Sequence, residues 1–217
     1  MPQHAPGPVK AAREATVETL AATLRALYEP ETGEGERVRV KTQVASFDVD
    51  IRTVQTLPQA EREWVWQLFE RNMRSLYERS AEGYDAQEKR TELFHPESRF
   101  LIVRQGSDPP LGYCIFRFDT EETASEEEGE DDMCDVVYCY ELQIEAAAQR
   151  RGAGRLLMQC LERLGRAYKM EKAMLTAFKH NADAVAFYQR IGFEPDAVDP
   201  SQYGIDDVDY VILSKDL

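Results

Sequence analysis

Four consecutive residues, Tyr138-Cys139-Tyr140-Glu141, place groups that can accept and donate protons inside an apolar stretch. Val, Leu and Ile residues surround them, so a carboxylate at position 141 would be partly desolvated. Desolvation raises the pKa of a carboxyl group towards neutral pH, where a general base is most effective. We therefore predict that Glu141 is a general base. The alternative is a glutamate on a solvated face or one paired with an arginine.

The two tyrosines pose a geometric problem. Tyr138 and Tyr140 are two residues apart, so in a regular strand they face one side and Glu141 faces the other. A β-bulge, which inserts one extra residue and is common beside active sites, would bring the three side chains together. We predict a catalytic site that uses all three residues, with core packing as the alternative for the tyrosines.

A basic, glycine-containing turn follows this strand, with the sequence Gln149-Arg150-Arg151-Gly152-Ala153-Gly154. Apolar residues then recur at helical spacing, so the turn opens a helix. The N-terminus of a helix attracts anions, and glycines let a phosphate approach the backbone. The turn lacks the Gly-Lys-Ser/Thr of a Walker loop and does not match Gly-x-Gly-x-x-Gly. It predicts a pyrophosphate site of another kind, or else a plain turn with solvated arginines.

The remaining elements predict one α/β domain with a mixed, mostly antiparallel sheet flanked by helices. Residues 1–36 are expected to form an N-terminal extension with a helix, and residues 37–217 the main domain. A flexible acidic loop is expected at about 120–135. The other expected elements are a helix from Lys10 to Tyr28, one long or two short strands within 38–54, helices at 57–80 and 85–94, a hairpin of 100–103 with 111–119, a central strand at 136–144, a strand at 173–178, a helix at 183–190 and a last strand at 210–213.

Composition limits the classes of function. The chain has 217 residues and a formal net charge of −14, which argues against a nucleic-acid binder because phosphate contacts need a basic surface. It shows no membrane-length apolar run and no signal-peptide layout, so we expect a soluble, intracellular protein. The four cysteines have no Cys-x-x-Cys spacing and are expected to be buried thiols.

The Gln/Arg-x-x-Gly-x-Gly/Ala pattern between a strand and a helix resembles the acetyl-CoA pyrophosphate loop of the GCN5-related N-acetyltransferase (GNAT) superfamily. The order of the expected elements is similar to the GNAT fold. A closer resemblance, to the NatD family of N-terminal acetyltransferases, is carried by the following motifs: Tyr138-Cys139-Tyr140-Glu141, Leu175-Thr176-x-Phe178-Lys179-His180-Asn181, Leu76-Tyr77-Glu78-Arg79-Ser80 and Phe116-Arg117-Phe118-Asp119.

The resemblance implies transfer of an acetyl group from acetyl-CoA, without a metal, to the α-amino group of histones four and two-A, whose tails start Ser-Gly-Arg-Gly. It implies basic histone tails as partners, activity as a monomer, and a nuclear and cytoplasmic location, and it leaves ribosome association open. No membrane or direct nucleic-acid partner is expected. The alternatives are a GNAT enzyme that acetylates a lysine or small amine, and a non-catalytic acidic protein that binds histone tails.

The resemblance also implies roles for residues. Glu141 is the base, Tyr138 and Tyr140 belong to the peptide and proton-handling site, and Tyr188 matches a general acid near the CoA sulfur, although it could equally be an apolar helix face. The implied cofactor contacts are Leu142, Gln143, Ile144, Gln149, Arg150, Arg151, Gly152, Ala153, Gly154 and Asn181, with the backbone of 142–144 pairing with the pantetheine arm. The implied substrate contacts are Tyr77, Gly83, Tyr84, Asp119, Glu121 and Tyr210. Two expected tryptophans are replaced here by Glu82 and Tyr84, which leaves the fine substrate preference open.

Overall fold

The computed structural model describes residues 7–28, 37–41, 46–106, 108–123 and 132–217, and within them one mixed sheet in the order β1-β2-β3-β4-β5-β6-β8-β7. Only β5 and β6 are parallel among these neighbours, which confirms the predicted mixed, mostly antiparallel sheet. β5 has four strands on one side, so it is internal, as its apolar sequence predicts. The strands are β1 (Arg37–Lys41), β2 (Ser46–Thr53), β3 (Arg99–Arg104), β4 (Gly112–Thr123), β5 (Asp132–Ile144), β6 (Lys172–Phe178), β7 (Glu194–Pro195) and β8 (Tyr210–Asp216).

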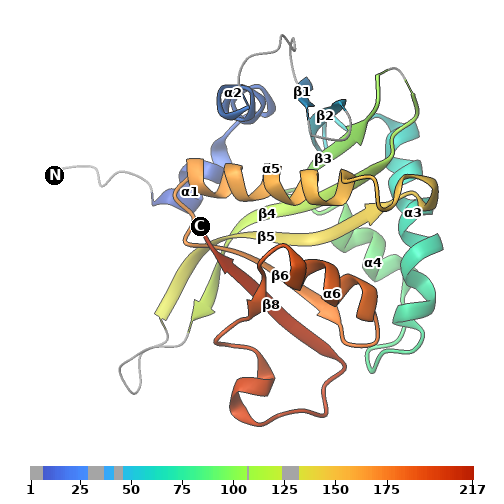
Figure 1. The fold of residues 1–217 in the computed structure, drawn as a ribbon, viewed down its shortest axis with the longest axis vertical. Helices are drawn as coiled ribbons and strands as arrows, with labels where there is room; N and C mark the ends of the chain where they lie inside the picture. The colour runs from blue at the N-terminus through green and yellow to red at the C-terminus, as the bar shows by residue number, and fades with distance from the viewer. Residues whose placement is uncertain (1–6, 29–36, 42–45, 107, 124–131) are drawn as a thin grey trace, which may run out of the picture.

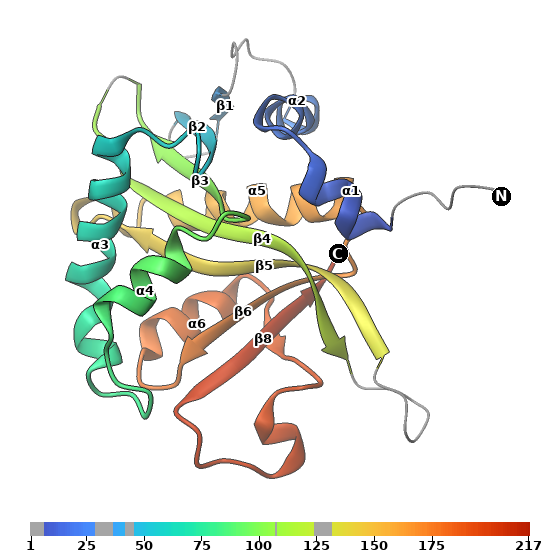
Figure 2. The same ribbon diagram turned by 180° about the vertical axis from the view of Figure 1, so that it is seen from behind.

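Helices cover both faces of the sheet (Figure 1). Figure 2 shows the opposite face, with α3 and α4 beside the sheet. The helices are α1 (Pro8–Glu14), α2 (Val17–Leu27), α3 (Gln59–Tyr77), α4 (Ala86–Leu93), α5 (Ala153–Ala167) and α6 (Ala182–Arg190), with short 3-10 turns at Ala146–Ala148 and Pro200–Tyr203. No helix in the described ranges is long and apolar enough to cross a membrane.

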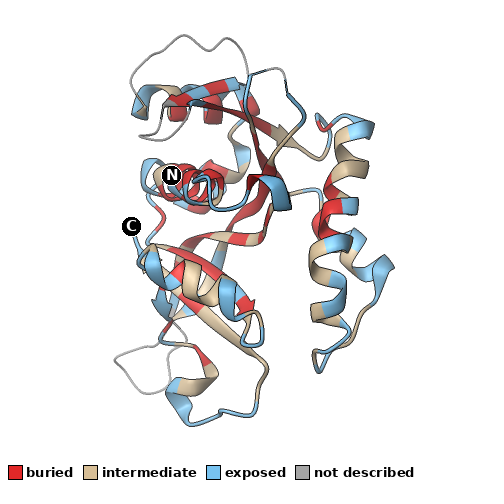
Figure 3. Ribbon diagram, turned by 45° about the vertical axis from the view of Figure 1, so that its right-hand side comes forward, coloured by how far each residue is buried: buried red, intermediate tan, exposed pale blue. Residues whose placement is uncertain are grey.

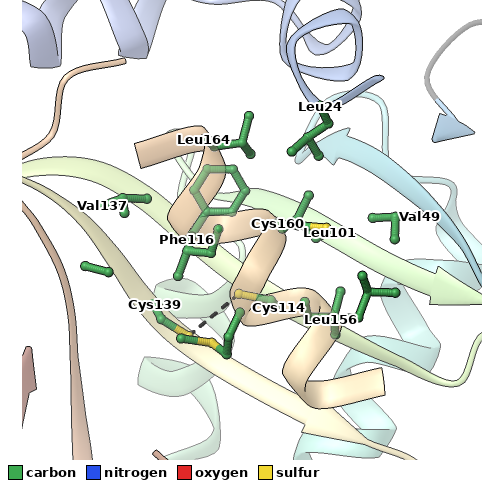
Figure 4. Close-up of a cluster of buried hydrophobic side chains, with 14 of the residues drawn as sticks. Leu24, Val49, Leu101, Cys114, Phe116, Val137, Cys139, Leu156, Cys160 and Leu164 are labelled. Carbon is green, nitrogen blue, oxygen red and sulfur yellow. Dashed lines mark hydrogen bonds between the residues drawn. The ribbon is translucent and has the colours of Figure 1, made fainter. Parts of the chain in front are cut away.

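Two large apolar clusters lie on opposite faces of the sheet. Figure 3 shows the buried residues concentrated in the sheet and in the helix faces turned towards it. The larger cluster joins α2 and α5 to one face, where Leu24, Leu164 and Phe116 meet (Figure 4). The smaller one joins α3 to the other face through Phe69 and Ile115. All four cysteines are buried free thiols, as predicted.

Two elements differ from the sequence-based expectation. The helix predicted from Lys10 to Tyr28 is two helices, because Ala15 is extended and Thr16 caps the second one by accepting a hydrogen bond from the Thr19 backbone N–H. The acidic loop is shorter than predicted at both ends. Thr120–Thr123 and Asp132–Asp135 are strand residues that pair with one another, and the centre of the predicted loop, 124–131, lies outside the described residues.

Candidate active site

A β-bulge brings Tyr140 and Glu141 to the same face of the sheet. Ile115 of β4 pairs with Glu141, whereas the next residue, Phe116, pairs with Cys139, so Tyr140 is the extra residue of the bulge. Paired residues in an antiparallel sheet share a face, and Ile115 belongs to the cluster packed against α3. Glu141 therefore points to the α3 side, where the ring of Tyr140 also packs. The bulge resolves the geometric conflict that a regular strand would create.

The Glu141 side chain is buried and has a perturbed pKa. Glu141 is only 7% exposed. Burial raises the pKa of its carboxyl to about 7, partly opposed by the Gln143 amide and by the Lys89 ammonium, both of which favour the ionised form. Gln143 Nε2 donates to Glu141 Oε1 at 2.6 Å. A carboxyl group that changes its protonation near pH 7 has the pKa that a general base needs.

Tyr138 and Tyr140 lie next to one another, with ring centroids 4.9 Å apart. The Tyr138 hydroxyl is 2.6 Å from Thr176 Oγ1, and burial raises the pKa of Tyr138 above its ordinary range. Burial also raises the pKa of Tyr140, whose ring lies 3.9 Å below the guanidinium of Arg117. Both phenols therefore stay protonated at neutral pH and can act as hydrogen-bond donors.

Asp119 already has a cationic partner in the chain. Arg13 of α1 pairs with Asp119 Oδ1 at 2.6 Å and donates to the Phe118 carbonyl at 2.8 Å. The other oxygen, Oδ2, accepts a hydrogen bond from the Tyr140 hydroxyl at 3.4 Å. Glu121 follows two residues later on the same face, half-buried, and burial together with the nearby Asp119 carboxylate raises its pKa. A basic ligand at this face would therefore share Asp119 with Arg13.

The glycine-containing turn has the backbone geometry of an anion site. Arg150 and Gly152 have positive φ angles of 63° and 91°, and Gly152 is the N-cap of the 15-residue helix α5. Nothing lies within 4 Å of a Cβ built on Gly152, so the backbone there is open to a ligand. Unpaired N–H groups of the first helical turn and the neighbouring arginines make this end of the site attractive to phosphate.

A cavity of about 730 Å³ joins this turn to the end of β5. Its basic end is lined by Arg150, Arg155 and Gly152, and its apolar end by Leu142, Ile144 and Phe187. β5 and β6 pair only from Val136 to Cys139 of β5, so the described part of β5 beyond the bulge has no β6 partner along the cavity. The cavity suits a long ligand with an anionic end and an amide-containing arm that pairs with a strand edge.

Most of the predicted cofactor contacts line this cavity, but not all. Gln149, Gly154 and Asn181 do, as does the buried Tyr188, whose pKa burial raises well above its ordinary value. Arg151 is exposed and Ala153 is buried inside the first turn of α5, and neither side chain lines the cavity. Gln143 lines the cavity as well, and its side-chain amide donates to Glu141.

Four of the six predicted substrate contacts, Tyr77, Gly83, Tyr84 and Tyr210, lie around the α3–α4 loop and the start of β8, apart from Asp119 and Glu121 on β4. Tyr77 packs edge-on against Phe178 at 4.8 Å, and Phe178 pairs with Tyr210 in the sheet. Gly83, with a φ angle of 75°, lies in the loop between α3 and α4, and this loop is tied to the start of β8 by a 2.7 Å hydrogen bond from the Ala81 N–H to Asp209. The Tyr84 hydroxyl donates to the carboxylate of Glu70.

Sequence reasoning missed the contribution of α3. Arg71, Asn72, Met73 and Leu76 line the cavity from this helix. Their spacing in the sequence indicates only a helix with one exposed and one apolar face, so no sequence signal marked them as cavity residues. Lys89 was also missed: its ammonium lies 4.5 Å from the centroid of the Tyr77 ring and pairs with Glu92. Among the described residues, no group of three or more His, Cys, Asp or Glu side chains could hold a metal ion.

Comparison with known proteins decides the family. The model of the acetyltransferase (GNAT) family matches residues 60–193, from the start of α3 to the residue before β7. The chain belongs to this family. The region that matches the family model contains the bulged strand, the glycine-containing turn and all residues that line the cavity.

Solved structures share the GNAT fold at low identity. A GNAT-family acetyltransferase from Listeria monocytogenes is 16% identical, with a TM-score of 0.53, over 83% of this chain and 100% of that chain. Arabidopsis thaliana NAA60, in complex with a bisubstrate analogue, is 13% identical, with a TM-score of 0.53, over 78% of this chain and 99% of that chain. Arabidopsis thaliana Naa50, in complex with the bisubstrate analogue CoA-Ac-MVNAL, is 17% identical, with a TM-score of 0.51, over 78% and 99%. At these identities the likeness shows the fold alone.

Proposed function

We propose that this GNAT acetyltransferase acts on protein N-termini, transferring an acetyl group from acetyl-CoA to the α-amino group of tails that start Ser-Gly-Arg-Gly, as in histones four and two-A. The observation that carries the proposal is Glu141, a buried carboxyl with a pKa of about 7 next to the wall of the cavity. Two features support a peptide substrate with a free α-amine and an arginine at its third position. One is the NatD-like Tyr138-Cys139-Tyr140-Glu141 motif, and the other is the pair of carboxylates, Asp119 and Glu121, on the face that carries both tyrosines.

The residues around the cavity have separate roles in this proposal. An α-amino group has a reference pKa of about 7.7–8.0, so part of it is neutral near neutral pH, and the neutral nitrogen with its lone pair attacks the thioester carbonyl carbon. Glu141 takes the one proton that this nitrogen loses as the amide bond forms and the C–S bond breaks. Acetyl-CoA supplies that thioester. The protonated Tyr188 lies in the cavity wall and gives its proton to the departing sulfur. Tyr138 and Tyr140 hold the peptide backbone by donating hydrogen bonds.

The anionic end of acetyl-CoA fits the turn that precedes α5. Replacing Gly152 with alanine is expected to raise the KM for acetyl-CoA about tenfold, because a left-handed backbone costs a residue with a Cβ about 1–2 kcal/mol and the turn would relax away from its phosphate-binding shape. Initial rates at varied acetyl-CoA measure this. Gly204→Ala is the matched control, since Gly204 also has a left-handed φ, of 72°, and open space around it, but lies away from the cavity. An equal KM change in both variants would contradict the assignment of the turn.

Glu121 is expected to recognise the third residue of the tail. Glu121→Gln should raise the KM for a Ser-Gly-Arg-Gly peptide about tenfold, the usual scale of a hydrogen bond to a charged group. With a Ser-Gly-Ala-Gly peptide the same substitution should change little. Glu122→Gln is the matched control, because Glu122 is exposed and lies on the other face of β4. A loss that is equal for both peptides would show that Glu121 does not read the arginine.

A panel of acceptors tests the function against its alternatives. Acetyl incorporation is measured for the free tail peptide, the same peptide with a blocked N-terminus, a blocked lysine peptide and a small polyamine. The proposal predicts incorporation into the free peptide alone. Preferred modification of lysine or of the polyamine would indicate a GNAT enzyme for another amine. Tight binding of the tail without incorporation into any acceptor would indicate a non-catalytic tail binder.

A further inference from the structure

The carboxylate of Glu141 is the end of a directed chain of hydrogen bonds that begins on α3. Asn72 Nδ2 donates to Gln143 Oε1 at 2.8 Å, and Gln143 Nε2 donates to Glu141 Oε1 at 2.6 Å. Gln143 and Glu141 are 6% and 7% exposed, so water competes little for these bonds. Gln143 can donate to the carboxylate only if its carbonyl oxygen faces Asn72, so the Asn72 amide group fixes the orientation of the Gln143 amide.

The first member of this chain is held in place by the packing of α3 against the end of β5. Trp64 Nε1 donates to Glu145 Oε1 at 2.8 Å, and Arg71 pairs with the two oxygens of the same carboxylate at 2.9 and 3.0 Å. Asn72 follows Arg71 directly and lines the cavity. The chain therefore runs from a fixed helix, along the wall of the cavity, to the buried carboxylate.

We propose that Asn72 and Gln143 are positioning residues that hold the Glu141 carboxylate ionised and correctly oriented for proton removal. The proposal rests on the proposed function, in which Glu141 is the general base. An ionised carboxylate only accepts hydrogen bonds, so a fixed donor favours the ionised form over the protonated one. Without Gln143, burial would leave a larger fraction of the carboxyl protonated at neutral pH, and that fraction could not take a proton from an amine.

Other titratable groups face Glu141 and also contribute to its field. Lys89 favours the ionised carboxylate, whereas Glu92 disfavours it. The remaining neighbours are uncharged at neutral pH and are Tyr77 on α3, Tyr113 and Cys114 on β4, and Tyr188 on α6. None of them provides the directed amide chain, so replacing Asn72 or Gln143 separates positioning from the general electrostatic field.

The test uses Gln143→Met and Asn72→Leu, which keep the side-chain size and remove the amide groups. The titration midpoint of the Glu141 carboxyl is followed by carbon NMR, beside the pH dependence of kcat. We expect Gln143→Met to move the midpoint up by about 1, the scale of one lost hydrogen bond to a charged group. If the midpoint moves from about 7 to about 8, the ionised fraction at pH 7 falls from half to a tenth, so kcat at pH 7 should fall about fivefold and recover at high pH.

Asn72→Leu should move the midpoint and kcat in the same direction by a smaller amount, because the Gln143 amide then loses only its orientation. Gln67→Met is the matched control, since Gln67 is an exposed glutamine on α3 that bonds Glu63. A midpoint in Gln143→Met equal to that of the wild type would overturn the positioning role. Failure of the proposed function would appear differently, as a wild-type rate that persists in Glu141→Gln, and the NMR midpoint would still decide whether the chain holds the carboxylate.

Discussion

Replacing Glu141 with glutamine is expected to lower kcat about 10²- to 10⁴-fold, the usual contribution of a general base. Glutamine keeps the size and most of the hydrogen-bonding capacity of the side chain but cannot take a proton from the amine. The KM for acetyl-CoA should change little, because Glu141 does not line the cavity. The measurement is single-turnover acetylation of the tail peptide, which separates chemistry from product release.

Stability measurements distinguish lost chemistry from lost structure. Burial raises the pKa of Glu141 from 4.5 to about 7, so between these values the folded protein holds a proton that the unfolded chain has released. Stability from this group therefore falls as the pH rises from about 4.5 to about 7, where burial of the ionised form becomes costly. Glu141→Gln removes this cost, so its Tm at about pH 8 should equal or exceed that of the wild type. A lower Tm at that pH would show that the variant is damaged in structure.

Tyr188→Phe is expected to lower kcat about 10²-fold at neutral pH, the lower end of the range for general acid catalysis. Tyr188 is 8% exposed, lines the cavity and stays protonated because burial raises its pKa, and the change removes only its proton-donating hydroxyl group. The KM for acetyl-CoA should stay within about twofold, since the ring still packs against Phe187 and Phe193.

Tyr203→Phe is the matched control for this substitution, because Tyr203 is 63% exposed and does not line the cavity. Steady-state kinetics with the tail peptide provide the comparison. A Tyr188→Phe enzyme with the kcat of the wild type would assign Tyr188 to the apolar face of α6, which is the alternative that the sequence leaves open.

Local sequence patterns were sufficient to predict most strands of the sheet, and the strand, turn and helix that lie beside the cavity. The β-branched and aromatic residues of β5, followed by Gly152, specify a strand, a turn and a helix without help from distant residues. The predicted hairpin of β3 and β4 also forms, because the turn cluster between them sets antiparallel pairing. The apolar alternation within 38–54 gave two short strands, as one of its two interpretations allowed.

Contacts between distant segments could not be predicted in the same way. Arg13 reads as one basic residue of an N-terminal helix, yet it pairs with Asp119, 106 positions away. Asn72 reads as a polar position of α3, and its role depends on the packing of that helix against β5. Such pairings depend on tertiary packing, which periodicity does not encode. A bulge in this strand was expected because a site using both tyrosines and Glu141 needs one, but its position at Tyr140 is set by the pairing of β5 with β4.

Mass spectrometry of a Ser-Gly-Arg-Gly tail peptide after incubation with acetyl-CoA is the most direct test of the central claim, with fragmentation to locate the added group. We predict that the free peptide gains one acetyl group on its α-amine, and that the same peptide with a blocked N-terminus gains none. Acetylation of a lysine side chain in the blocked peptide, or no acetylation of the free peptide, would contradict the assignment of this GNAT enzyme to protein N-termini.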